Sequence, residues 1–126
     1  HWAAHKLEAL TNYQLSHAEA VVVGLALDTV YSRKKGLLAE IPAARVLKVL
    51  AGLGLKIYHP ALDWTNKKGK RRVLDGLDEF REHLGGRLTV LLLKDLGEGV
   101  DVHEFDMDLL DESVEELRGI WENAKL

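Results

Sequence analysis

The spacing of apolar residues along the chain predicts a mainly helical protein. In five segments the apolar positions recur every three or four residues, which places them on one face of a helix. One other segment, residues 88–93, is typical of a strand, and residues 100–104 alternate with period two after a turn at 95–99. The predicted helices span about residues 1–10, 17–35, 43–52, 70–84 and 108–123. We therefore expect a multi-helical domain with one short β-hairpin.

The second predicted helix carries the clearest signals for its two ends. Ser16 is a favourable N-cap residue, and Glu19 follows it at the spacing of a capping box. Gly36 comes directly after three basic residues, 33–35, and is expected to end the helix. Because this helix is apolar most of the way around, we expect it to be central and buried.

Composition narrows the class of protein. The 126 residues carry a formal net charge of −3 and contain no cysteine. The length suits one domain, the charge favours neither a nucleic-acid nor a membrane partner, and disulfides and thiolate metal sites are excluded. The longest apolar run, residues 20–27, is too short to span a bilayer. With no signal peptide apparent, we expect a cytoplasmic protein.

Three of the six histidines lie within the first seventeen residues: His1, His5 and His17. His1 and His5 share one helical face, and a short turn would return His17 to the same point. Imidazole is a common zinc ligand, so these side chains form a candidate metal site. A carboxylate often completes such a site, and Glu8 and Glu19 are nearby. Glu19 is better explained as the capping-box partner, and Glu8 also fits a solvated helix position.

The same residues resemble a motif of the 3-dehydroquinate synthase superfamily of sugar-phosphate cyclases. That family carries a Gly-His-x-x-Gly-His-x-x-Glu segment, then a short loop, then His-Gly-Glu-Ala-Val. The matching residues here are His1, His5, Glu8 and the run 17–21. Residues 85–92 and 96–98 resemble the family's Gly-Gly-x-Leu-x-Phe-Val-Leu strand and its Ile-Gly-Glu turn. The resemblance covers nearly the whole chain in order.

The resemblance implies that residues 1–126 are the helical C-terminal domain of such a cyclase. His1 and His17 would be ligands of zinc, or of cobalt, and a glutamate upstream of the chain would be the third ligand. His5 would be the catalytic residue, close to the substrate phosphate. The implied partners are a phosphorylated sugar and an N-terminal domain that binds NAD, with a homodimer left open. The chain also starts without methionine inside a predicted helix, so we expect it to be a fragment.

Two departures from the family pattern bear on the substrate. Dehydroquinate synthases carry a lysine pair before the double glycine, where a lysine meets the substrate carboxylate, and residues 79–86 lack it. Ala4 also stands where the family has its second glycine. Both departures resemble relatives that cyclise sedoheptulose 7-phosphate, or dehydroquinate-synthase-like proteins of bacterial secondary-metabolite operons.

Other interpretations of the sequence remain open. The chain could be a helical binding or scaffold module with structural histidines, or the C-terminal domain of a metal-dependent alcohol dehydrogenase. The segment 16–20 and the double glycine at 85–86 argue against the dehydrogenase. The basic run 67–72 is expected to be a solvated loop, with phosphate binding as its functional alternative. The role of His83 is left open, whereas His59 and His103 are expected to be structural or surface residues.

Overall fold

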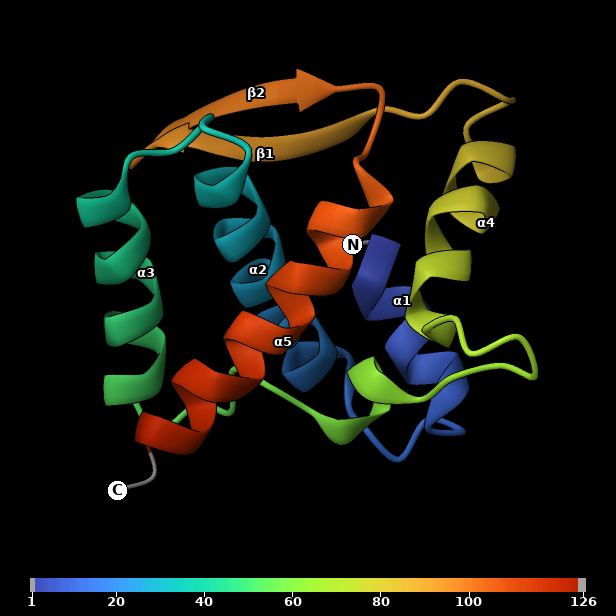
Figure 1. Cartoon of the computed structure of the whole chain (residues 1–126), viewed down its shortest axis with the longest axis horizontal. Coiled ribbons are helices and arrows are strands. Elements are labelled where there is room, and N and C mark those ends of the chain that lie inside the picture. The colour runs from blue at the N-terminus through green and yellow to red at the C-terminus, as the bar shows by residue number, and fades with distance from the viewer. Residues whose placement is uncertain (1, 125–126) are drawn as a thin grey trace.

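The computed structural model describes residues 2–124, in which five α-helices surround a small core and one two-stranded sheet covers their ends (Figure 1). The mainly helical class with one hairpin is therefore confirmed. The elements in chain order are α1 Trp2–Leu10, α2 His17–Lys34, α3 Glu40–Gly52, α4 Asp75–His83, β1 Val90–Asp95, β2 Glu98–Val102 and α5 Met107–Ala124, with 3₁₀ turns at Pro60–Asp63 and Arg72–Leu74. None of the helices in the described part is both long enough and apolar enough to cross a membrane.

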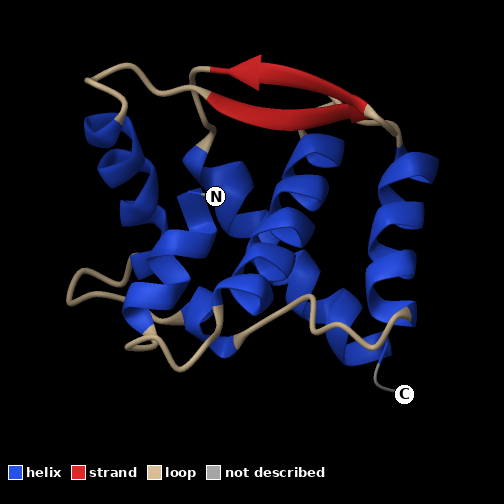
Figure 2. Cartoon of the chain, turned by 180° about the vertical axis from the view of Figure 1, so that it is seen from behind, coloured by secondary structure: helices blue, strands red, loops and turns tan. Residues whose placement is uncertain are grey.

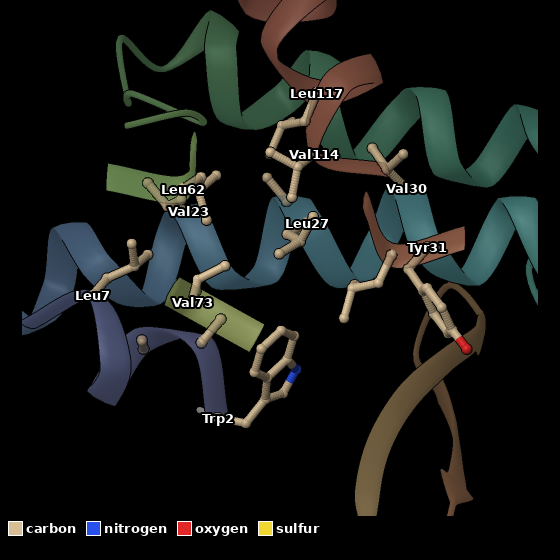
Figure 3. Close-up of a cluster of buried hydrophobic side chains, with 14 of the residues drawn as sticks. Trp2, Leu7, Val23, Leu27, Val30, Tyr31, Leu62, Val73, Val114 and Leu117 are labelled. Carbon is tan, nitrogen blue, oxygen red and sulfur yellow. The ribbon is translucent and has the colours of Figure 1, made fainter. Parts of the chain in front are cut away.

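Helix α2 is the centre of the domain, as its sequence predicted. It packs against α1, α3, α5 and strand β1. Its inward residues Val23, Leu27 and Val30 are almost completely buried and meet Val114 and Leu117 of α5 (Figure 3). Full burial of such a side chain contributes roughly 1.5–3 kcal/mol to stability. This shared core therefore holds α2 in one position and one orientation relative to α5.

Helix α1 lies unusually close to α2 because small residues form their contact. Ala3, Ala4 and Ala20 are buried between the two helices. A Cβ atom added at Gly24 of α2 would lie 3.5 Å from the backbone nitrogen of Ala4. Small side chains at these positions let the backbones approach, so side chains at the adjacent ends of the two helices are brought near each other.

The hairpin lies across one end of the helices (Figure 2). Its strands pair antiparallel with Val90 opposite Val102, and a bulge separates Leu93 from Asp95. The turn is shorter than expected because Gly97 has φ +74°, a backbone conformation that suits glycine and allows pairing to continue to Glu98. Both strands are therefore displaced from the predicted ranges toward the turn.

The predicted helix over residues 70–84 is wrong at its beginning, because α4 starts only at Asp75. Arg71 is extended, with φ −63° and ψ 127°, and forms an isolated β-bridge with Thr65. A single 3₁₀ turn then leads into α4. The extended conformation turns the Arg71 side chain toward carboxylates elsewhere in the chain, and these contacts outweigh the local preference for helix.

Candidate metal-binding site

A tight turn joins the end of α1 to the start of α2. The Thr11 hydroxyl donates to the Leu7 carbonyl at 2.9 Å and accepts the backbone N–H of Leu15 at 3.3 Å. Asn12 and Tyr13 both have positive φ, 53° and 61°. This left-handed conformation is unusual for a bulky residue such as tyrosine. The turn therefore holds two strained residues in order to reverse the chain within six residues.

The predicted capping box then fixes the first turn of α2. The backbone N–H of Glu19 donates to Ser16 Oγ at 3.2 Å, and the Ser16 N–H donates to Glu19 Oε1 at 3.2 Å. Hydrogen bonds from the Ser16 side chain and backbone to its carboxylate lower the pKa of Glu19. The interpretation of Glu19 as a capping residue is confirmed, and His17 becomes the first residue of α2.

The turn and the cap bring together His5, Glu8 and His17, which we call the histidine cluster. Glu8 Oε2 lies 3.2 Å from His17 Nδ1 and 3.7 Å from His5 Nδ1, and the two ring centroids are 5.9 Å apart. The side chains of His5 and His17 are 66% and 55% exposed, but that of Glu8 is only 14% exposed. The interpretation of Glu8 as a solvated residue is therefore wrong. Its carboxylate is largely covered and lies beneath two imidazoles.

The donor chemistry of the histidine cluster fits one half of a zinc site. A metal-bound histidine usually donates its other ring N–H to a carboxylate, and Glu8 lies at that position beside His17. His1, the other predicted ligand, lies outside the described residues. Within residues 2–124, no group of three or more carboxylate, histidine or cysteine side chains is arranged to hold a metal ion. The assignment of His1 and His17 as ligands therefore stays a prediction.

A cleft of about 620 Å³ opens beside His5, between α1, α4 and the hairpin. Lys6 lies in it, with its Nζ atom 2.6 Å from Glu79 Oε1 of α4. Gly76 permits α4 to come this close, because a Cβ atom there would be 2.9 Å from both Lys6 Cβ and the Trp2 carbonyl oxygen. His5 therefore borders both the histidine cluster and a cavity that is large enough for a small-molecule substrate.

The remaining predicted histidines do not join this site. His59 caps a 3₁₀ turn, with Nδ1 accepting the Ala61 N–H at 3.0 Å, and burial lowers its pKa. His103 Nδ1 lies 2.9 Å from the Leu88 carbonyl oxygen. Both have structural contacts, as expected. His83 is in α4, but its side chain lies outside the described part, so its role stays open.

The basic run behaves as a loop except at one residue that the sequence analysis missed. Lys67, Lys68 and Lys70 are exposed, as expected. Arg71, however, is largely buried. Together with Asp63 and Asp111 it forms what we call the arginine cluster, with N–O distances of 3.0 Å to Asp63 and 2.8 Å to Asp111.

Asp63 has further partners in this cluster. Its carboxylate accepts hydrogen bonds from Tyr58 and Arg118. Burial opposes its ionisation, but these hydrogen bonds and those from Arg71 outweigh burial and lower the pKa of Asp63. Arg118 and Asp111 belong to α5, so the cluster ties the loop before α4 to that helix. No local signal in the sequence indicates this pairing, because Asp111 is forty residues from Arg71.

Asp28, an acidic residue on α2, was also missed by the sequence analysis. Its carboxylate accepts a hydrogen bond of 3.0 Å from Trp2 Nε1. Burial raises the pKa of Asp28 to about 7, although the Trp2 hydrogen bond opposes this rise. A single aspartate in an otherwise apolar helix was the available signal. Asp28 contacts α1 through Trp2, but no described contact links Asp28 to the histidine cluster.

Comparison with known proteins supports the resemblance seen in the motifs. Residues 1–74 match the family described as 3-dehydroquinate synthase C-terminal. The 3-dehydroquinate synthase of Aeropyrum pernix is 37% identical over 97 residues, covering 77% of this chain and 25% of the relative. That of Clostridium perfringens is 34% identical over 100 residues, covering 79% of this chain and 27% of the relative. The chain thus spans about a quarter of the length of these relatives.

One solved structure extends the likeness to the fold. It is ValA, a 2-epi-5-epi-valiolone synthase from Streptomyces hygroscopicus with NAD⁺ and Zn²⁺ bound. The TM-score is 0.80 at 25% sequence identity, and the match covers 93% of this chain and 32% of ValA. The likeness includes the hairpin and α5, which lie beyond the residues matched by the family model.

Proposed function

Since the chain belongs to the 3-dehydroquinate synthase C-terminal family, we propose that it is the metal- and substrate-binding part of an NAD- and zinc-dependent sugar-phosphate cyclase. The observation that carries the proposal is the histidine cluster: two exposed imidazoles share one covered carboxylate beside a cleft. The Zn²⁺ and NAD⁺ of ValA support the choice of metal and cofactor.

The proposal divides the work between this chain and a preceding domain. That domain would bind NAD and contribute the glutamate ligand, in agreement with the short span of the chain relative to its curated relatives. His1 and His17 would hold the zinc ion from this side. When bound, zinc supplies Lewis-acid stabilisation of a substrate hydroxyl, and NAD transiently accepts and returns a hydride. We further propose that the complete enzyme is cytoplasmic.

His5 would serve the substrate and leave metal binding to its neighbours. Its ring is exposed and borders the cleft, so it can donate a hydrogen bond to a phosphate oxygen that enters there. As the phosphate leaves during carbocycle formation, a proton held by the imidazole would neutralise the charge that develops on the departing oxygen. Glu8 Oε2 lies 3.7 Å from His5 Nδ1, on the other side of this ring from the solvent.

The proposed substrate is a sugar phosphate without a carboxylate, of the sedoheptulose 7-phosphate type. A desolvated substrate carboxylate needs a cation beside it. Lys6 is the cation found in the cleft, and it is already paired with Glu79. Residues 79–86 supply no lysine. ValA is a 2-epi-5-epi-valiolone synthase rather than a dehydroquinate synthase, which agrees with this choice.

Metal analysis of single variants in the complete enzyme tests the proposal. We expect His17→Ala, and likewise His1→Ala, to weaken zinc binding by at least ~100-fold, because each removes an inner ligand. His59→Ala is the matched control, since that imidazole caps a 3₁₀ turn on a different part of the chain, and its zinc content should equal that of wild type. Full zinc binding by a folded His17→Ala variant would overturn the proposal and favour a module with structural histidines.

A further inference from the structure

We propose that Glu8 is a positioning residue for the metal site: it holds the ring of His17 through Nδ1 and thereby assigns Nε2 as the metal-binding nitrogen. This inference rests on the proposed function, because it requires His17 to be a zinc ligand. The alternatives are that the Glu8 carboxylate is itself a zinc ligand, or that it has a structural role only.

The contact geometry identifies which nitrogen Glu8 engages. Glu8 Oε2 is 3.2 Å from His17 Nδ1, within hydrogen-bonding distance. An ionised carboxylate oxygen can only accept a hydrogen bond, so the bond between these two atoms places a proton on Nδ1. In a neutral imidazole the other nitrogen then has the lone pair, which is the form that binds a metal ion. The same oxygen lies 3.7 Å from His5 Nδ1, a longer and weaker contact.

The difference in exposure shows why Glu8 can act as a fixed support. Its side chain is far less exposed than those of the two histidines above it. A carboxylate removed from water needs donors, and the imidazole N–H of His17 supplies one. The Glu8 carbonyl is also held, accepting the Tyr13 N–H at 2.8 Å and the Thr11 hydroxyl at 3.2 Å. Both backbone and side chain of Glu8 are therefore tied to the turn that positions His17.

The orientation of the cluster argues against Glu8 as a zinc ligand. Glu8 belongs to the last turn of α1, and its engaged oxygen is on the side where His17 begins α2. A ligand role for Glu8 would require that oxygen to leave His17 Nδ1. The two imidazoles, in contrast, project toward solvent and so toward the face on which a second domain and the substrate would arrive.

The test is zinc and cobalt binding by the complete enzyme carrying Glu8→Gln. Glutamine has nearly the same volume but is neutral and accepts less strongly. We expect zinc affinity to fall by about 10–100-fold, as is typical when the carboxylate behind a ligating histidine is removed. The visible absorption of bound Co²⁺ should keep its band positions, since the inner ligands are unchanged. Glu19→Gln is the matched control and should leave the affinity unchanged, because glutamine also forms a capping box with Ser16 and so keeps the first turn of α2.

The outcomes separate this inference from the function on which it rests. If wild-type enzyme binds zinc through His17 but Glu8→Gln binds it equally well, the positioning role is wrong and the proposed function stands. If Glu8→Gln changes the Co²⁺ bands to those of a different coordination number, Glu8 is a ligand and the inference is overturned. If His17→Ala binds zinc like wild type, the proposed function itself fails.

A measurement on the wild-type protein covers the case in which Glu8→Gln does not fold. Long-range ¹H–¹⁵N correlation spectra of the metal-free enzyme report which ring nitrogen of His17 carries the proton. We expect the Nδ1–H tautomer, and a folded His59→Ala variant identifies one of the other histidine signals. An Nε2–H tautomer for His17 would overturn the inference without the use of any variant at Glu8.

Discussion

The histidine cluster and the arginine cluster are both groups of titratable side chains, but they are assembled differently. The first lies within residues 5–17, whereas the second joins residues forty positions apart. In the arginine cluster, cations and carboxylates are present together, and each largely buried charge has a partner of opposite sign. In the histidine cluster one carboxylate faces two imidazoles, and both imidazoles remain more than half exposed.

This difference indicates which cluster carries chemistry. A set of charges that neutralise one another inside the protein has little left to offer a ligand, and its contribution is to hold segments together. A covered carboxylate that supports exposed imidazoles instead presents nitrogen atoms to solvent in a fixed orientation. We therefore expect changes in the arginine cluster to alter stability and changes in the histidine cluster to alter binding.

The largest effect is expected for Arg71→Ala. The change leaves Asp111 without Arg71 and leaves Asp63 with Arg118 as its cation. Several charge-assisted hydrogen bonds are lost together, so the free energy of unfolding should fall by about 3 kcal/mol. Urea denaturation of this chain measures the loss. The neighbouring Arg72→Ala is the control and should stay within about 0.5 kcal/mol of wild type, because Arg72 is exposed. Zinc affinity in the complete enzyme should not change; a loss of zinc in folded Arg71→Ala would contradict the division between the clusters.

A smaller effect is expected for Gly76→Ala, which tests how closely α4 must approach α1 beside His5. The new methyl group would meet Lys6 Cβ and the Trp2 carbonyl at 2.9 Å, and the backbone oxygen cannot move away easily. We expect a loss of about 2 kcal/mol in thermal or urea unfolding. Gly24→Ala provides the contrast: its methyl group meets Ala4 at ordinary contact distance, so we expect no loss. Equal stability of the two variants would show that the α1–α4 contact can relax.

A third effect concerns pH and Asp28, which belongs to neither cluster. Because the folded protein holds the Asp28 proton up to pH of about 7, above the ordinary aspartate value, it binds more protons there than the unfolded chain. This contribution to stability is complete at low pH and is lost as pH rises toward and through 7. Asp28→Asn keeps an acceptor for Trp2 and cannot ionise, so its stability relative to wild type should rise as the pH is raised from 4 to 8.

Denaturation of wild type and Asp28→Asn at pH 4 and pH 8 measures this contribution. The stability of Asp28→Asn relative to wild type should be lowest at pH 4 and higher at pH 8. The same difference in stability at both pH values would mean that Asp28 does not titrate in this range.

Much of the fold followed from local sequence signals. The capping box at Ser16 predicted where the central helix α2 begins. The apolar residues around most of that helix predicted that it is buried. Both signals depend on residues within one or two helical turns. The strong strand at 88–93 predicted the hairpin. Its exact register did not follow, because the bulge after Leu93 and the short turn at Gly97 shift the pairing by local geometry.

The candidate site was predicted only in part, and the missing part depends on tertiary contacts. Histidine spacing identified His5 and His17 as neighbours, which their ring contact confirms. The burial of the Glu8 side chain depends on the left-handed turn at Asn12 and Tyr13. The sequence did not indicate that turn, because neither position is a glycine. Arg71 was hidden in a run of exposed basic residues because its partner Asp111 is on another helix.

The close contact of α1 with α2 has a consequence for the spacing of the two imidazoles. The distance between the rings of His5 and His17 depends on how near the two helix axes lie, and that depends on the methyl groups of Ala3 and Ala4 against Gly24. A longer side chain at position 4 would push the helices apart and spread the rings without touching a polar atom. Residues with no chemistry of their own therefore set how far one imidazole stands from the other.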